Sequence, residues 1–153
     1  MKIYTESFGR LSAMKLSCKE CVQYSRIGKN RVLVRGKNGY YAWVLSEEVI
    51  PLLMDCNEQK IDASEILREK EGDKLMTRAI DVISVSRGPS YELQSTDGTV
   101  MVHVQKKFIK KFPGCEFYAN APDDRILVKE PRILHKTVGI ILPFVVHKED
   151  AHA

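Results

Sequence analysis

The sequence predicts an α+β fold made of two degenerate β-β-β-α repeats with antiparallel sheets, followed by C-terminal strands. One observation is that residues 31–54 resemble residues 90–113, about 60 positions further along the chain. A second is that a turn pair occupies the same place in both copies, as Asn38-Gly39 and as Asp97-Gly98. A third is that both copies end in apolar residues at helical spacing. We therefore expect a duplicated supersecondary unit.

The first repeat is expected to contain three strands, around residues 21–24, 31–35 and 40–45. In the middle strand, Val32 and Val34 fall on one face, and Arg31, Leu33 and Arg35 fall on the other. A further short strand is expected near residues 2–8.

A helix is expected to follow the first repeat's hairpin. Ser46 can cap it, and Glu47 and Glu48 suit the positive end of the helix dipole. Pro51 removes one backbone amide and disfavours helical angles at the preceding residue. This helix should therefore be short or kinked.

A second, acidic helix is predicted over residues 61–71. Asp62 is a good N-cap, Glu65 completes a capping box, and Ile61 with Ile66 can form a hydrophobic staple. Gly72 should end this helix.

The second repeat begins with a strand over residues 80–85, and its helix should span residues 105–112. Strands are expected afterwards near residues 116–121, 125–130 and 136–146; Gly139 and Pro143 in the last of these indicate a bulge or an edge position. We expect the first module, with the acidic helix, to span residues 1–73. The second module, with the C-terminal strands, should span residues 74–153, and both should form one compact unit.

The net charge of +4 is distributed unevenly along the chain. Residues 10–40 hold eight basic residues against one acid, whereas residues 44–73 hold nine acids against three basic residues. The two segments could neutralise each other in the fold, or the basic segment could form a face that binds a polyanion.

Few residues indicate catalysis or metal binding. Cys18 and Cys21 have the spacing of a zinc ligand pair, but a structural zinc site needs four ligands, usually as two close pairs. His103 lies in a predicted strand, on the face opposite Val102 and Val104, where a surface or half-buried histidine is a simpler interpretation than a catalytic base. No phosphate-binding loop, dinucleotide fingerprint or nucleophile elbow is present. We therefore expect no catalytic residue, no metal and no cofactor.

Two stretches resemble known families. Residues 79–128 resemble the strand–strand–strand–helix–strand succession of LytTR-type DNA-binding domains, but lack the HRS-aromatic-x-V-N signature that follows the helix in those domains. Residues 40–67 resemble the hairpin and helices of PqqD-like peptide-recognition domains. No site residue is carried over from either family.

The leading expectation is a non-enzymatic protein that binds nucleic acid through a basic β-ribbon and a lysine-rich helix. The ribbon would use Arg26, Lys29, Arg31, Arg35 and Lys37, and the helix would use Lys106, Lys107, Lys110 and Lys111. The alternative is a protein–protein interaction module or inhibitor that acts as a homo-oligomer. It would pair through the apolar run 138–146 or through an exposed strand edge.

A cytoplasmic location without membrane contact is expected. The chain begins without an apolar signal region, and the longest apolar run, residues 138–146, is too short to cross a bilayer and contains Pro143. Four irregularly spaced cysteines do not form a secreted disulfide framework.

Overall fold

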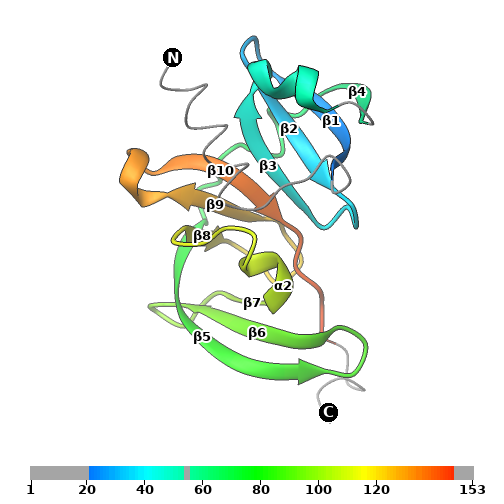
Figure 1. Cartoon of the computed structure of the whole chain (residues 1–153). Helices are drawn as coiled ribbons and strands as arrows, with labels where there is room; N and C mark the ends of the chain where they lie inside the picture. The colour runs from blue at the N-terminus through cyan, green and yellow to red at the C-terminus, as the bar shows by residue number, and fades with distance from the viewer. Residues whose placement is uncertain (1–20, 54–55, 147–153) are drawn as a thin grey trace. The chain divides into compact units, whose positions relative to one another are not determined.

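A computed structural model describes residues 21–53 and 56–146 of the chain (Figure 1). The strand predicted near residues 2–8 lies outside these residues. The chain divides into two compact units, Met1–Arg68 and Glu69–Ala153. Each unit is described by itself.

The described residues of the first unit form four strands and one 3₁₀-helix. They are β1 (Cys21–Ile27), β2 (Arg31–Gly36), β3 (Tyr41–Ser46), η1 (Glu47–Leu52) and β4 (Asn57–Asp62). The strand order is β4-β1-β2-β3; β2 pairs antiparallel with β1 and β3, whereas β4 pairs parallel with β1. The fully buried side chains of this unit include Val32, Val34, Trp43, Leu45 and Val49.

The turn between β2 and β3 forms where the sequence places it. The N–H of Gly39 donates to the carbonyl oxygen of Gly36 at 3.0 Å, and Gly39 has a φ of 75°. The corresponding turn in the second unit has the same hydrogen bond, from Gly98 to Ser95 at 3.0 Å, and Gly98 has a φ of 72°. Glycine is favoured at both positions because it adopts a positive φ without a steric penalty.

The predicted cap at Ser46 is confirmed, but the helix that it starts is η1. The N–H of Glu48 donates to Ser46 Oγ at 3.3 Å, and Pro51 lies inside the segment. Because proline lacks an N–H, the segment does not extend into a regular α-helix.

The acidic helix predicted over residues 61–71 is wrong. Residues up to Asp62 belong to β4, and turns follow. The carboxylate of Asp62 accepts a hydrogen bond from the N–H of Ser64 at 2.9 Å, as a helix cap would. The residues that follow form turns and no helix. The supposed staple residues, Ile61 and Ile66, are both exposed. The backbone pairing between β4 and β1 outweighs the local capping preference here.

Up to residue 146, the second unit contains six strands and two short helices. They are β5 (Lys74–Ser84), β6 (Gly88–Ser95), β7 (Met101–Gln105), α2 (Lys106–Ile109), β8 (Glu116–Ala119), β9 (Ile126–Glu130), η2 (Pro131–Ile133) and β10 (Lys136–Ile141). Their order is β10-β9-β8-β5-β6-β7, and all the pairs are antiparallel. The register shifts between Thr137 and Gly139, so the bulge predicted in the last strand is confirmed.

Helix α2 and the turn that follows it supply apolar residues to the core of the second unit. Phe108 and Phe112 are buried, as their helical spacing predicts. They belong to a core that also includes Leu93 of β6 and Val102 and Val104 of β7. The α2 segment contacts both of these strands.

The predicted α+β class with two β-β-β-α repeats is therefore wrong, because the structure is mostly β. The only α-helix of the described residues is α2, which is four residues long. Pro51 in η1 and the Pro113-Gly114 pair after α2 restrict both predicted repeat helices to short segments. The pairings also differ, because β1 has a parallel partner in β4 and β5 has an antiparallel partner in β8. In the described part of the chain, no helix has the length and apolar character needed to cross a membrane.

Candidate functional site

Four residues of the predicted basic ribbon lie along β2 and its two flanking turns. Arg31 and Arg35 are on the same face of β2, because residues two and four apart in a strand point the same way. Lys29 is in the turn before β2, and Lys37 is in the turn after it. We call these four residues the β2 cation row.

The β2 cation row has no acidic partner among the described residues. Lys29, Arg35 and Lys37 are exposed, and Arg31 is half-buried. Arg35 Nη1 donates to Gln23 Oε1 at 3.3 Å, which is a contact with a neutral amide. The four positive charges are therefore not neutralised within the described part of the chain.

Arg26 does not belong to this row. It is paired with Val32, so its side chain points to the face opposite Arg31 and Arg35. Its guanidinium forms ion pairs with Glu47 at 3.1 Å and with Glu58 at 3.7 Å. Mutual neutralisation of the basic and acidic segments therefore occurs at this residue.

The four predicted helix lysines have different surroundings. Lys106 Nζ lies 2.9 Å from a carboxylate oxygen of Asp81 and 5.0 Å from the centre of the Tyr91 ring. Lys107 and Lys110 are exposed, and Lys111 is half-buried. All four belong to the second unit, whereas the β2 cation row belongs to the first.

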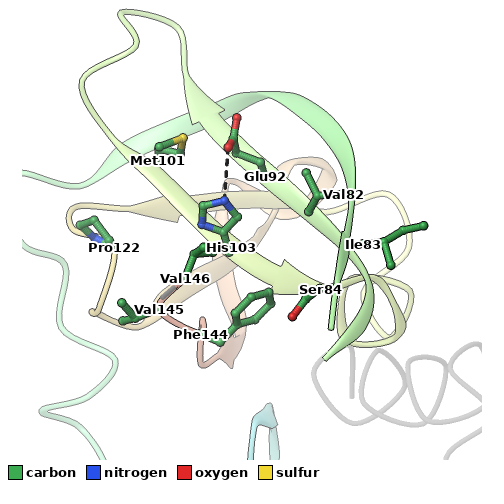
Figure 2. Close-up of a pocket in the computed structure, with 10 residues that line it drawn as sticks. All are labelled: Val82, Ile83, Ser84, Glu92, Met101, His103, Pro122, Phe144, Val145 and Val146. Atoms are coloured by element: carbon green, nitrogen blue, oxygen red, sulfur yellow. Dashed lines mark hydrogen bonds and ion pairs between the residues drawn. The ribbon is translucent and has the colours of Figure 1, made fainter. Parts of the chain in front are cut away.

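The second unit contains an open pocket of about 660 Å³, shown in Figure 2. Its lining is mainly apolar and comes from β5, β6, β7, the loop after β8 and the segment after β10. The lining residues are Val82, Ile83, Ser84, Glu92, Met101, His103, Pro122, Phe144, Val145 and Val146.

A histidine–carboxylate pair is the main polar feature of this pocket. His103 Nε2 lies 3.2 Å from Glu92 Oε1 (Figure 2). Gln94 Nε2 donates to Glu92 Oε2 at 2.7 Å. The N–H of Phe144 donates to the carbonyl oxygen of His103 at 2.9 Å, which holds the Phe144 ring beside the imidazole. The polar groups bind one another inside a hollow whose walls are apolar, so the pocket suits an apolar side chain.

Sequence reasoning placed His103 in a strand as a surface or half-buried residue, and the structure shows it half-buried, but the pocket was missed. The missing part is the wall made by residues 144–146, which the sequence presents as the continuation of the last strand. Pro143 could have indicated that the last strand ends before residues 144–146, because proline cannot donate a hydrogen bond to a neighbouring strand.

The zinc-like cysteine pair falls partly outside the described residues, because Cys18 precedes them. Cys56 and Cys115 are thiols. Within residues 21–53 and 56–146, no group of three or more histidine, cysteine or carboxylate side chains is arranged to hold a metal.

Comparison with known proteins gives no relative: no family model, no curated protein and no solved structure matches the chain.

Proposed function

We propose that this chain is a non-enzymatic binding protein that holds the phosphate backbone of a nucleic acid on the β2 cation row. The supporting observation is that Lys29, Arg31, Arg35 and Lys37 follow a single strand with no acidic partner among the described residues. We propose a cytoplasmic location, where irregularly spaced cysteines stay reduced.

The spacing of the row supports contact with a regular polyanion. A strand rises about 3.3 Å per residue, so Arg31 and Arg35 are about 13 Å apart along β2. Phosphates of one strand of duplex DNA advance about 3.4 Å along the helix axis per base step. With β2 along the helix axis, Arg31 and Arg35 can therefore contact phosphates about four base steps apart, while contributing no sequence-specific contact by themselves.

The first prediction is that binding depends steeply on salt. Four phosphate contacts should lower the affinity for duplex DNA roughly a hundredfold between about 50 and 200 mM salt. Fluorescence polarisation with labelled single-stranded and duplex oligonucleotides at several salt concentrations measures this slope. Absence of binding to both oligonucleotides at low salt would refute the proposal.

Charge-matched variants locate the contact. Replacing Arg31 and Arg35 by glutamine should weaken binding and reduce the salt slope by about half, because two of four contacts are lost. K107Q/K110Q removes the same charge from α2 and its C-cap residue and should leave the slope unchanged. Equal losses in the two double variants would mean that binding follows net charge, and the β2 cation row would be rejected.

Protein binding is the second candidate function, and one observation favours it. The long strand β5 has an open edge with exposed apolar side chains beside the pocket. Self-pairing through residues 138–146 has less support, because Val138, Ile140 and Ile141 are buried within the chain.

A further inference from the structure

Most of one edge of β5 has no strand beside it in the described part of the chain. β5 pairs with β8 only at Lys74 and Leu75, whereas it pairs with β6 from Met76 to Ser84. Figure 1 shows β5 as a long curved strand running outside β6. Backbone N–H and C=O groups along such an edge can form a ladder with a further strand.

The open edge carries large exposed apolar side chains. Ile80 is 46% exposed, Ile83 is 74% exposed and Val85, in the turn that follows, is 75% exposed. Ile80 lies on one face of β5 and Ile83 on the other, so apolar surface is exposed on both sides of the edge, where a binding partner could cover it.

The pocket lies at this edge, because three of its lining residues, Val82, Ile83 and Ser84, are β5 residues. A strand added along β5 would present every second side chain to the sheet face that carries the pocket. Val82 is opposite Ser90 in β6, so it points to the same face of the sheet as Ser90. Glu92, two positions after Ser90, and its partner His103 in β7 also point to this face. An apolar side chain opposite Val82 would therefore lie over the pocket.

Arg78 supplies a charge that selects the partner. It lies on the same face as Val82, four residues away, it is exposed, and it forms no ion pair with a described residue. A residue opposite Arg78 would be four positions from the residue opposite Val82, and an acidic side chain there would complement the guanidinium. A second copy of β5 fits poorly, because its one acidic residue, Asp81, points to the other face.

We propose that the edge of β5 binds an extended segment of another protein as an added strand. The segment has an apolar side chain that fills the pocket and an acidic side chain, four positions away, that pairs with Arg78. This surface belongs to the second unit and is separate from the β2 cation row.

Synthetic peptides test the proposal with the full-length chain. The probes are two labelled threonine-rich peptides, with aspartate four positions before or four positions after a leucine, since the added strand can run in either direction. One of the two should bind in fluorescence polarisation, and a scrambled peptide should not. N-methylation of the bound peptide along the edge that faces β5 should abolish binding, and methylation along the other edge should be tolerated.

Charge exchange identifies the contact at Arg78. R78E should weaken binding of the aspartate peptide by about tenfold, and replacing its aspartate by lysine should restore binding. V82T places a hydroxyl beside the pocket and should also reduce affinity. K110E is the charge-matched control in the same unit and should bind the aspartate peptide as the native chain does.

Amide hydrogen exchange provides a readout that a non-specific apolar contact would not give. Peptide binding should slow exchange at alternate amides between Met76 and Ser84. Equal affinity for the scrambled peptide, or unchanged exchange in β5, would overturn the proposal. So would a dimer whose β5 amides are already protected without peptide, because a second copy would then occupy the edge.

Discussion

At the scale of single residues, the most buried ion pair in the described part of the chain joins Arg125 and Asp73. Two guanidinium nitrogens of Arg125 donate to the two carboxylate oxygens of Asp73, each at 2.9 Å, and the side chains are 4% and 8% exposed. The sequence gives no sign of this pair, because Asp73 reads as the end of an acidic segment and Arg125 as the start of a strand.

Breaking this pair should destabilise the fold strongly. D73N keeps the size of the side chain but leaves the buried charge of Arg125 without its carboxylate, which should cost about 3 kcal/mol of unfolding free energy. Urea denaturation monitored by circular dichroism measures this loss. E65Q, which removes an exposed ion pair with Arg68, is the control and should have little effect. Similar losses of unfolding free energy in D73N and E65Q would contradict the stabilising role of the buried Arg125–Asp73 pair.

The lowered pKa of Asp73 predicts how the stability of the fold depends on pH. Burial alone would raise the pKa of Asp73, but hydrogen bonds from Arg125 and from the Lys70 backbone, with the charge of Arg125, lower it overall. A carboxyl whose pKa is lower in the folded state stabilises the fold above its unfolded pKa of about 3.9. This stabilisation is lost as the pH falls through the folded pKa. Acid titration of the unfolding free energy should therefore show a steeper loss below about pH 4 in the native chain than in D73N.

At the scale of elements, most strands and turns were predictable, whereas β4 and the helices were not. The β2–β3 and β6–β7 turns follow from local chemistry, because glycine is needed where φ is positive. The predicted helix over residues 61–71 failed because capping residues report only a local preference. Strand β4 forms through its pairing with β1, more than 30 positions earlier, and no local pattern encodes that partner.

Two glycines in the hairpin turns should tolerate substitution differently. G98A meets no atom nearby and suffers only from the positive φ, so we expect a loss of about 1 kcal/mol. G36A places a methyl group into the ring of Tyr41, which is buried and cannot move away cheaply, so we expect about 2–3 kcal/mol. Thermal and urea unfolding of the two variants tests this order, and the reverse order would contradict it.

The candidate site was predictable only in part, because several of its contacts join residues that are distant in the sequence. Alternation along β2 places Arg31 and Arg35 together, and it could have separated Arg26 from them once the register with β1 was known. The ion pairs of Arg26 and Lys106 depend on residues distant in sequence. The pocket depends on a contact between His103 and Phe144 that no local pattern indicates.

At the scale of the whole molecule, the two proposed binding surfaces belong to different units. The β2 cation row lies in the first unit, and the β5 edge lies in the second. Each surface offers different chemistry, since one presents uncompensated positive charge and the other presents backbone groups with an apolar pocket.

The two activities should therefore be separable by mutation. R31Q/R35Q should lose oligonucleotide affinity and keep the native affinity for the aspartate peptide, and R78E should do the reverse. Both measurements are made by fluorescence polarisation on the same protein preparations. If either variant kept the native circular dichroism spectrum but lost both activities, the assignment of two separate surfaces would fail.

The parallel pairing of β4 with β1 has a consequence for the chain as it is synthesised. β1, β2 and β3 are consecutive and can pair as soon as they leave the ribosome, but the outer edge of β1 stays uncovered until Asp62 has emerged. Uncovered edges of nascent sheets are sites of misassembly between chains. The strand that covers this edge is β4, in which every second residue is charged: Glu58, Lys60 and Asp62. Charged side chains on an edge strand oppose its pairing with strands of other chains.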